Sequence, residues 1–104
     1  MPFGEFVNQI PAIVFLAIHL TAFLIGAYFA WRSFGSGATL AGLGFSLFAL
    51  AEISYMTYHL DWTIFLFAHT VSEVLDLLAF VAIFAWASQR TFSRVEARAD
   101  ATVR

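Results

Sequence analysis

Cysteine is absent from this chain, and charged residues make up only 12% of its 104 positions. Without cysteine the protein has no disulfides, no thiolate metal sites and no cysteine nucleophile. The few arginines form no basic patch with interleaved polar residues, so we expect no nucleic-acid partner. A glycine-rich phosphate loop, an HExxH motif and a nucleophile elbow are also missing, which excludes common catalytic motifs of soluble enzymes.

Apolar residues are abundant instead, at 62% of the chain. A soluble domain has about 45–50% apolar and about 25% charged residues. A chain of this length forms one small domain, which cannot hide so much apolar surface from water. The composition therefore predicts a membrane protein in contact with the lipid bilayer.

Three long apolar runs cover residues 10–31, 38–60 and 62–87. Each reaches the ~20 residues that cross ~30 Å of hydrocarbon as a helix. Helices are expected because they satisfy every backbone polar group within one segment. The predicted fold is all-α, with three transmembrane helices that form one membrane domain over residues 10–87.

The predicted connections between the spans are short. "RSFGSGA" at 32–38 is typical of a Gly/Ser turn, and "HLDW" at 59–62 is tighter still. Spans two and three should therefore form an antiparallel hairpin. After the third span, the polar segment 88–104 either continues the helix or frays.

The arginines predict the orientation of the chain. Arg32 lies in the first connection, and the other four follow the third span: Arg90, Arg94, Arg98 and Arg104. Because Lys and Arg accumulate on the cytoplasmic side, we expect a multi-pass protein of the inner (cytoplasmic) membrane. Its short N-terminus, residues 1–9, would be external and its tail, 88–104, cytoplasmic.

Small residues recur every four positions in the first two spans. The two stripes are Ala22, Gly26 and Ala30, and Ala38, Gly42 and Ser46. Such stripes let neighbouring helices approach closely. We therefore expect tight packing toward the cytoplasmic half, with more room toward the outside.

Ionisable groups interrupt the apolar runs at five positions: His19, Glu52, His69, Glu73 and Asp76. An Asp within the hydrocarbon costs at least ~2.5–3.5 kcal/mol on insertion scales. His69, Glu73 and Asp76 share one helix face, and so do Glu52, Tyr55 and His59. Each span thus has one polar face, and we expect the three faces to meet in the interior of a helix bundle.

Depth in the membrane indicates which of these groups can lie close together. At ~1.5 Å of rise per residue, four groups fall in one layer near mid-membrane: His19, Glu52, His69 and Glu73. Asp76 lies about a turn deeper. His59 is expected at the outer edge, outside this layer, and Tyr55 and Tyr58 in the belt of interfacial aromatics.

Two cofactor hypotheses follow. A transition metal such as Zn or Fe would take imidazole and carboxylate ligands from the layer: His19, Glu52, His69 and Glu73. Alternatively, His19 and His69 would be the axial ligands of haem b, with phenylalanines around the macrocycle. Either centre suits a subunit of a larger membrane redox assembly or a homo-oligomer, because three helices alone bury little surface.

Two further hypotheses need no cofactor. Glu52, Glu73 and Asp76 could relay protons or ions across the membrane. Alternatively, the protein is an accessory subunit whose neutral acids hydrogen bond to His and Tyr across helices and fix their packing. Nothing in the sequence decides whether the protein is an enzyme.

A resemblance supports the three-span interpretation. "FAHTVSEVLDLLAF" resembles the last span of small three-helix membrane proteins of haloarchaea and some bacteria, in which an AHxxxE element opens a similar helix. "AYFAWRSF", after the first span, is similar to the same proteins. The likeness covers about half the chain. It implies three spans and no particular activity, and it carries over only His69 and Glu73 as motif positions.

Overall fold

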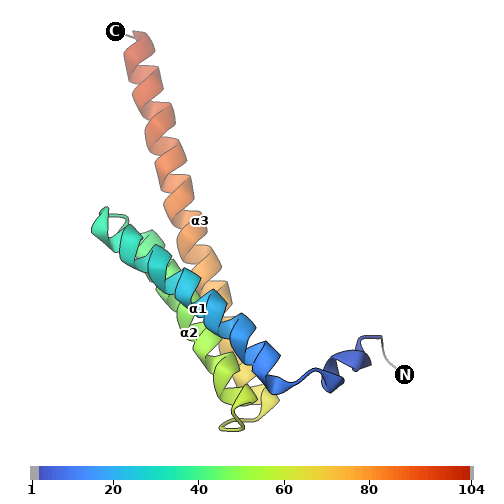
Figure 1. Cartoon of the computed structure of the whole chain (residues 1–104). Coiled ribbons are helices and arrows are strands. Elements are labelled where there is room, and N and C mark those ends of the chain that lie inside the picture. The colour runs from blue at the N-terminus through green and yellow to red at the C-terminus, as the bar shows by residue number, and fades with distance from the viewer. Residues whose placement is uncertain (1–2, 104) are drawn as a thin grey trace.

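The computed structural model of the protein describes residues 3–103 (Figure 1). A short 3-10 helix, η1 (Glu5–Gln9), precedes three α-helices: α1 (Ala12–Gly35), α2 (Thr39–His59) and α3 (Phe65–Val103). No strand occurs within the described range. The predicted all-α class is therefore confirmed.

All three α-helices are long and apolar enough to cross a membrane. The chain is accordingly a small multi-pass membrane protein, with apolar helix surfaces suited to lipid. Exposed large apolar side chains are found along each helix, for example Leu24, Leu50 and Leu78. Such exposure would be unfavourable in water, whereas hydrocarbon accepts it.

The first helix is longer than predicted. α1 continues to Gly35, so Arg32 to Gly35 are helical, although the sequence suggested a turn there. The reversal needs only three residues, because Gly37 adopts a φ of +82° and the N–H of Ala38 donates to the carbonyl of Ser33 at 2.8 Å. Glycine takes this left-handed conformation without steric cost, which makes so short a turn possible.

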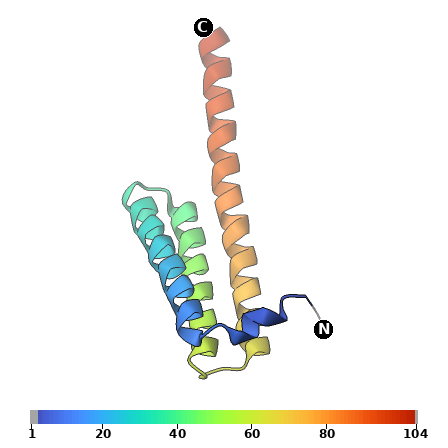
Figure 2. The same cartoon turned by 45° about the vertical axis from the view of Figure 1, so that its right-hand side comes forward.

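The connection between α2 and α3 confirms the predicted antiparallel hairpin (Figure 2). Asp61 has a φ of +63°, a conformation that Asp tolerates better than most residues. The N–H of Trp62 donates to the carbonyl of Thr57 at 2.9 Å, and the hydroxyls of Thr57 and Thr63 lie 3.0 Å apart. We call this end of the molecule the hairpin end.

The three helices form an open layer rather than a closed bundle. α2 packs against both α1 and α3, whereas no Cα of α1 comes within 8 Å of a Cα of α3 over residues 3–103. The expectation that three polar faces meet in a bundle interior was therefore wrong. The physical reason lies in α2, whose small buried residues offer close contact on two sides: Ala41, Gly42, Gly44, Ala49 and Ala51.

Glycines mark the closest approaches between helices. A Cβ at Gly44 of α2 would lie 2.5 Å from Cγ1 of Ile83 and 3.0 Å from the carbonyl oxygen of Ala79, both in α3. A Cβ at Gly26 of α1 would lie 2.8 Å from the ring of Phe48 in α2. Both helix pairs therefore depend on the missing side chain of a glycine.

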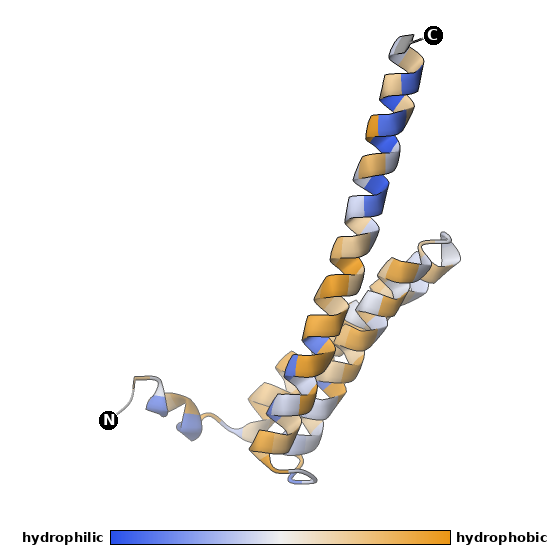
Figure 3. Ribbon diagram, turned by 180° about the vertical axis from the view of Figure 1, so that it is seen from behind, coloured by the Kyte–Doolittle hydropathy of each residue, from blue (hydrophilic) through white to orange (hydrophobic). Residues whose placement is uncertain are grey.

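The third helix continues far beyond the other two (Figure 1). Its 39 residues include the polar tail, and Figure 3 shows the change from apolar to hydrophilic residues along it. In this structure the tail continues the third helix as far as Val103. From Ser88 to Val103 the helix extends about 24 Å at 1.5 Å per residue.

Candidate functional site

A hydrogen bond joins α1 to α2 among the predicted polar residues. Nδ1 of His19 lies 2.5 Å from Oε2 of Glu52. The two side chains are 19% and 11% exposed. Among residues 3–103 neither side chain has another hydrogen-bond partner, so this bond holds the two helices in one register.

Aromatic rings stack around His19 at the hairpin end. Its ring centroid lies 5.0 Å from that of Tyr55 and 5.3 Å from that of His59, in nearly parallel orientation. Phe15 extends the stack, with its ring 4.9 Å from that of His59. His59 therefore belongs to the cluster, although its depth suggested that it would lie apart. The placement differs because His59 faces α1 and leans toward the ring of His19.

Tyr55 connects this stack to α3. Its hydroxyl lies 3.4 Å from Nδ1 of His69, and the His69 ring stacks on Phe65 with 5.1 Å between centroids. A second bond between α2 and α3 runs from the hydroxyl of Ser72 to the carbonyl oxygen of Ala51, at 2.9 Å. Polar contacts thus attach α1 and α3 separately to α2.

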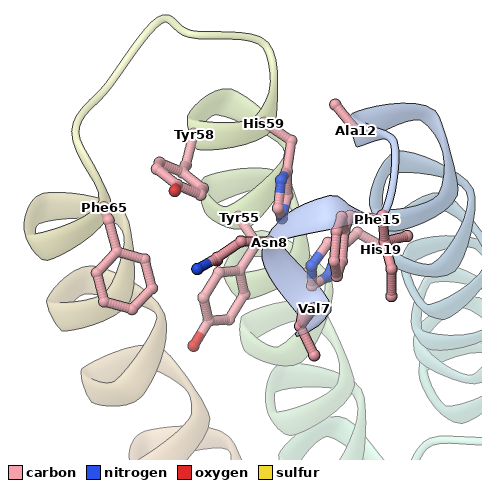
Figure 4. Close-up of a pocket in the computed structure, with 10 residues that line it drawn as sticks. Val7, Asn8, Ala12, Phe15, His19, Tyr55, Tyr58, His59 and Phe65 are labelled. Atoms are coloured by element: carbon pink, nitrogen blue, oxygen red, sulfur yellow. The ribbon is translucent and has the colours of Figure 1, made fainter. Parts of the chain in front are cut away.

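The stacked rings line a pocket of about 400 Å³ at the hairpin end (Figure 4). Phe15 and His19 reach into it from α1, Tyr58 and His59 from α2, and Phe65 from α3. Residues of the N-terminal segment border it as well. The expected room at this end is present, but it is not confined to this end, because a second cavity of about 430 Å³ lies farther along the helices.

Within the described residues, the acids of α3 form no hydrogen bond with His19 or Glu52. Glu73 is exposed on the helix surface. Oδ1 of Asp76 is buried and has no hydrogen-bond partner within residues 3–103. Asp76 lines a second cavity of about 430 Å³, which we call the α1–α3 groove. The groove is otherwise apolar and is lined by Ile25, Gly26, Phe29, Phe45, Phe48, Ala79, Phe80 and Ile83.

The structure does not bring the four predicted metal ligands together. In the part of the chain that it describes, no group of three or more His, Asp or Glu side chains is placed to hold a metal ion. His19 is paired with Glu52, His69 contacts Tyr55, and Glu73 is exposed. The two histidines predicted as haem ligands stand on helices that are separated by α2.

The sequence interpretation missed the role of Tyr55. Its membership of the interfacial belt was inferred from residue type, but its position on the face of Glu52 was the better signal. Three residues separate the two along α2, so both point to the same side. The contact with His69 and the stack with His19 follow from that shared face.

No family model matches this chain, and neither a curated protein nor a solved structure does. The site is therefore interpreted from its own geometry. Its main features are a polar network centred on α2, a pocket at the hairpin end and an apolar groove that contains one unpartnered carboxyl oxygen.

Proposed function

We propose that this protein is an accessory subunit of a membrane assembly, with a polar network that holds its helices in an open layer and a groove that receives a helix of another subunit. The arrangement of the hydrogen bonds supports the first part. His19–Glu52 joins α1 to α2, and Ser72 joins α3 to α2. The network therefore fixes the positions of α1 and α3 against α2, although α1 and α3 do not contact each other as they would in a closed bundle.

The energetics agree with a packing role. Hydrogen bonds between membrane helices contribute about 0.6 kcal/mol on average and about 1.7 kcal/mol at most. An unpaired Glu52, by contrast, would place a polar group in hydrocarbon at a cost of several kcal/mol. The pair thus contributes little to overall stability but determines which faces of α1 and α2 meet. Any other arrangement would leave the Glu52 carboxyl group without a hydrogen-bond partner.

Asp76 is the observation that carries the second part. The residue lines an apolar groove, and its buried Oδ1 has no hydrogen-bond partner in the described chain. A lipid acyl chain would fill the groove but would offer no hydrogen-bond donor. We assign the groove to a transmembrane helix that brings a donor side chain to Asp76, since this occupant satisfies both the apolar walls and the carboxyl oxygen.

Photo-cross-linking from single positions in native membranes tests this assignment. A photoreactive residue at Phe80, which lines the groove, is compared with one at Leu66 of the same helix, which lines neither the groove nor the pocket at the hairpin end. Both side chains are 68% exposed, so both are accessible to reagents and neighbours. We expect an adduct of one defined mass from Phe80 and none from Leu66.

The dependence on Asp76 distinguishes a specific partner from chance capture. Asp76→Leu should abolish the adduct, whereas Asp76→Asn, which keeps a hydrogen-bonding oxygen, should retain it. An adduct with the mass of a second copy would identify the occupant as this same chain. That result, or adducts with lipid alone, would contradict the assignment to another subunit.

A metal or haem centre is the second candidate, and the orientation of His19 favours it. A carboxylate commonly holds one nitrogen of a metal-binding imidazole, as Glu52 holds Nδ1 here. Nε2 would then be free for a ligand in the pocket that His19 and His59 line. The near-parallel stack of the two rings opposes a shared ion, because a metal lies in the plane of each imidazole that binds it.

Metal analysis and an absorption spectrum of the purified protein test that candidate. Stoichiometric Zn or Fe, or a Soret band, that is lost in His19→Ala and kept in Thr21→Ala supports it. The third candidate is a proton relay, favoured by the series of His59, His19 and Glu52 that leads inward from the pocket. It requires proton flux in reconstituted vesicles that Glu52→Gln abolishes.

We further propose the orientation that the arginines indicate, with the N-terminus outside and the C-terminus in the cytoplasm. The inner membrane is the corresponding location. The likeness of residues 67–80 to the last span of small three-helix membrane proteins of haloarchaea and some bacteria supports the three-span architecture and adds no activity. Under this proposal the pocket opens outward, and the long end of α3 lies in the cytoplasm.

A further inference from the structure

The tail of α3 carries a stripe of uncharged residues that is exposed from Phe92 onward. Five uncharged residues form it, and we call them the tail stripe: Ser88, Phe92, Val95, Ala99 and Thr102. Their spacing alternates between four and three residues, as in the a and d positions of a coiled coil. Phe92 is 69% and Val95 59% exposed.

The charged residues of the tail all avoid the stripe. On a helical wheel Arg94 and Arg98 lie along one side of it, and Glu96 and Asp100 lie along the other. In heptad terms these are the c and g positions on the basic side and the e and b positions on the acidic side. The stripe is thus a neutral seam between a basic and an acidic edge.

The seam continues into the membrane part of α3. The same heptad positions are filled there by Val74, Leu78 and Val81, which are 53%, 50% and 55% exposed. They lie on the side of the helix away from Ser72, which bonds to α2. The packing of α2 on α3 therefore leaves these three side chains exposed on the same face as the tail stripe.

We propose that α3 pairs with α3 of a second copy of this chain, in parallel, through the tail stripe. Copies inserted in one membrane with one orientation present their tails on the same side and at the same height. Parallel pairing then places the g side of each helix beside the e side of its partner. The basic edge of one copy meets the acidic edge of the other, whereas antiparallel pairing would bring like charges together.

The low stability of an isolated helix in water also supports pairing of the tail. A helix of about 12–15 residues is marginal in water on its own, because packing supplies most helical stability. The end of α3 projects beyond α1 and α2 (Figure 3), and every residue from Gln89 to Thr102 is exposed. A second copy supplies the missing neighbour and removes Phe92 and Val95 from water. This interface is distinct from the α1–α3 groove and holds whether or not the groove is occupied.

Single cysteines test the interface, and the natural absence of cysteine makes the background clean. Phe92→Cys and Val95→Cys put a cysteine on the seam. The control variants, Arg94→Cys and Ala97→Cys, put one outside the seam. Under mild oxidation of intact membranes, we expect disulfide-linked dimers at least about fivefold more abundant at the seam positions than at the others. Equal cross-linking at all four positions, or none, would overturn the proposal.

The main rival occupant of the stripe is the membrane surface, since a basic amphipathic helix can lie in the lipid interface. A water-soluble maleimide distinguishes the two under reducing conditions. For a parallel pair, solubilisation as dilute monomers should make Phe92→Cys reactive. The lipid interpretation predicts instead that Phe92→Cys is protected from the maleimide in vesicles that hold only one copy each, and that no disulfide forms. That result would assign the stripe to lipid and contradict pairing.

Charge exchange tests the parallel arrangement without disturbing the seam. One variant combines Arg94→Glu with Arg98→Glu, and the other combines Glu96→Arg with Asp100→Arg; Arg90 is kept in both. Each variant has like charges on both edges, so we expect each alone to lose most of its Val95→Cys dimer. Mixing the two should restore it as a heterodimer. Failure to recover, with both variants inserted normally, would contradict the parallel pairing.

Discussion

His19 and Glu52 lie on different helices and share a hydrogen bond of 2.5 Å that joins α1 to α2. His59 of α2 also faces α1, but it stacks on the His19 ring and shares no hydrogen bond with it in the described structure. The bond to Glu52 therefore fixes both the rotation of α1 about its axis and its height against α2.

Removing the imidazole should weaken the α1–α2 pair. For His19→Leu we expect the free energy of unfolding to fall by more than the about 1–2 kcal/mol of a hydrogen bond in model membrane helices, because Glu52 is also left unpaired. Reversible unfolding in mixed micelles measures the change. Thr21→Ala is the control, because Thr21 is exposed and bonds only to the carbonyl of Ala17 in its own helix. An equal loss in both variants would show that the His19–Glu52 bond contributes nothing specific.

Filling the closest α2–α3 contact should be destabilising. Gly44→Ala places a Cβ 2.5 Å from Ile83 and 3.0 Å from the backbone of Ala79, so the helices must move apart. We expect a loss of about 1–3 kcal/mol in the same unfolding experiment, as for other overpacked sites. At Gly35 a Cβ would meet nothing within 4 Å, so Gly35→Ala should be neutral or slightly stabilising. The idea of a tight α2–α3 contact fails if Gly44→Ala is as stable as the original chain.

Ser72 should matter more than a serine that bonds within its own helix. Ser72 is fully buried and donates to Ala51 across the α2–α3 interface at 2.9 Å. Ser72→Ala should cost about 0.6–1.7 kcal/mol of unfolding free energy. Ser54→Ala removes a bond to Leu50 in the same helix and should cost less. If the two losses were the same, the bond between helices would have no advantage over the local one.

The orientation of the chain can be read from two cysteine variants. Asp61→Cys lies in the hairpin and Ser93→Cys in the tail of α3, and the chain has no cysteine of its own. A membrane-impermeant maleimide added to intact cells should label Asp61→Cys, whereas Ser93→Cys should react only after the membrane is opened. The reverse pattern would place the C-terminus outside and contradict the rule drawn from the arginines.

The polar residues show which features of the site can be predicted from the sequence. The spacing of Glu52 and Tyr55 correctly put both on one side of α2, because helical periodicity is a local property. The pairing of His19 with Glu52 was anticipated through their common depth, which depends only on rise per residue. The prediction that His59 lies apart from His19 was wrong, because the stacking of the two rings depends on how α1 packs against α2.

The glycines show the same division. The recurrence of Gly26 and Gly42 at helical spacing correctly indicated close helix contacts, because a missing side chain permits approach whatever the partner. The partner itself was not predictable. Gly44 meets Ile83 of α3 through the geometry of the hairpin, which no spacing along α2 specifies.

By itself, the sequence determined that this chain forms three membrane-spanning helices and where each one has its polar face. These properties follow from hydrophobicity and from the fixed geometry of a single helix. Only the tertiary structure decided that α2 lies between two helices that do not touch, that Tyr55 connects His19 to His69, and that Asp76 faces a groove. Those relationships depend on which small residues let which backbones approach, and that choice is made between helices rather than along them.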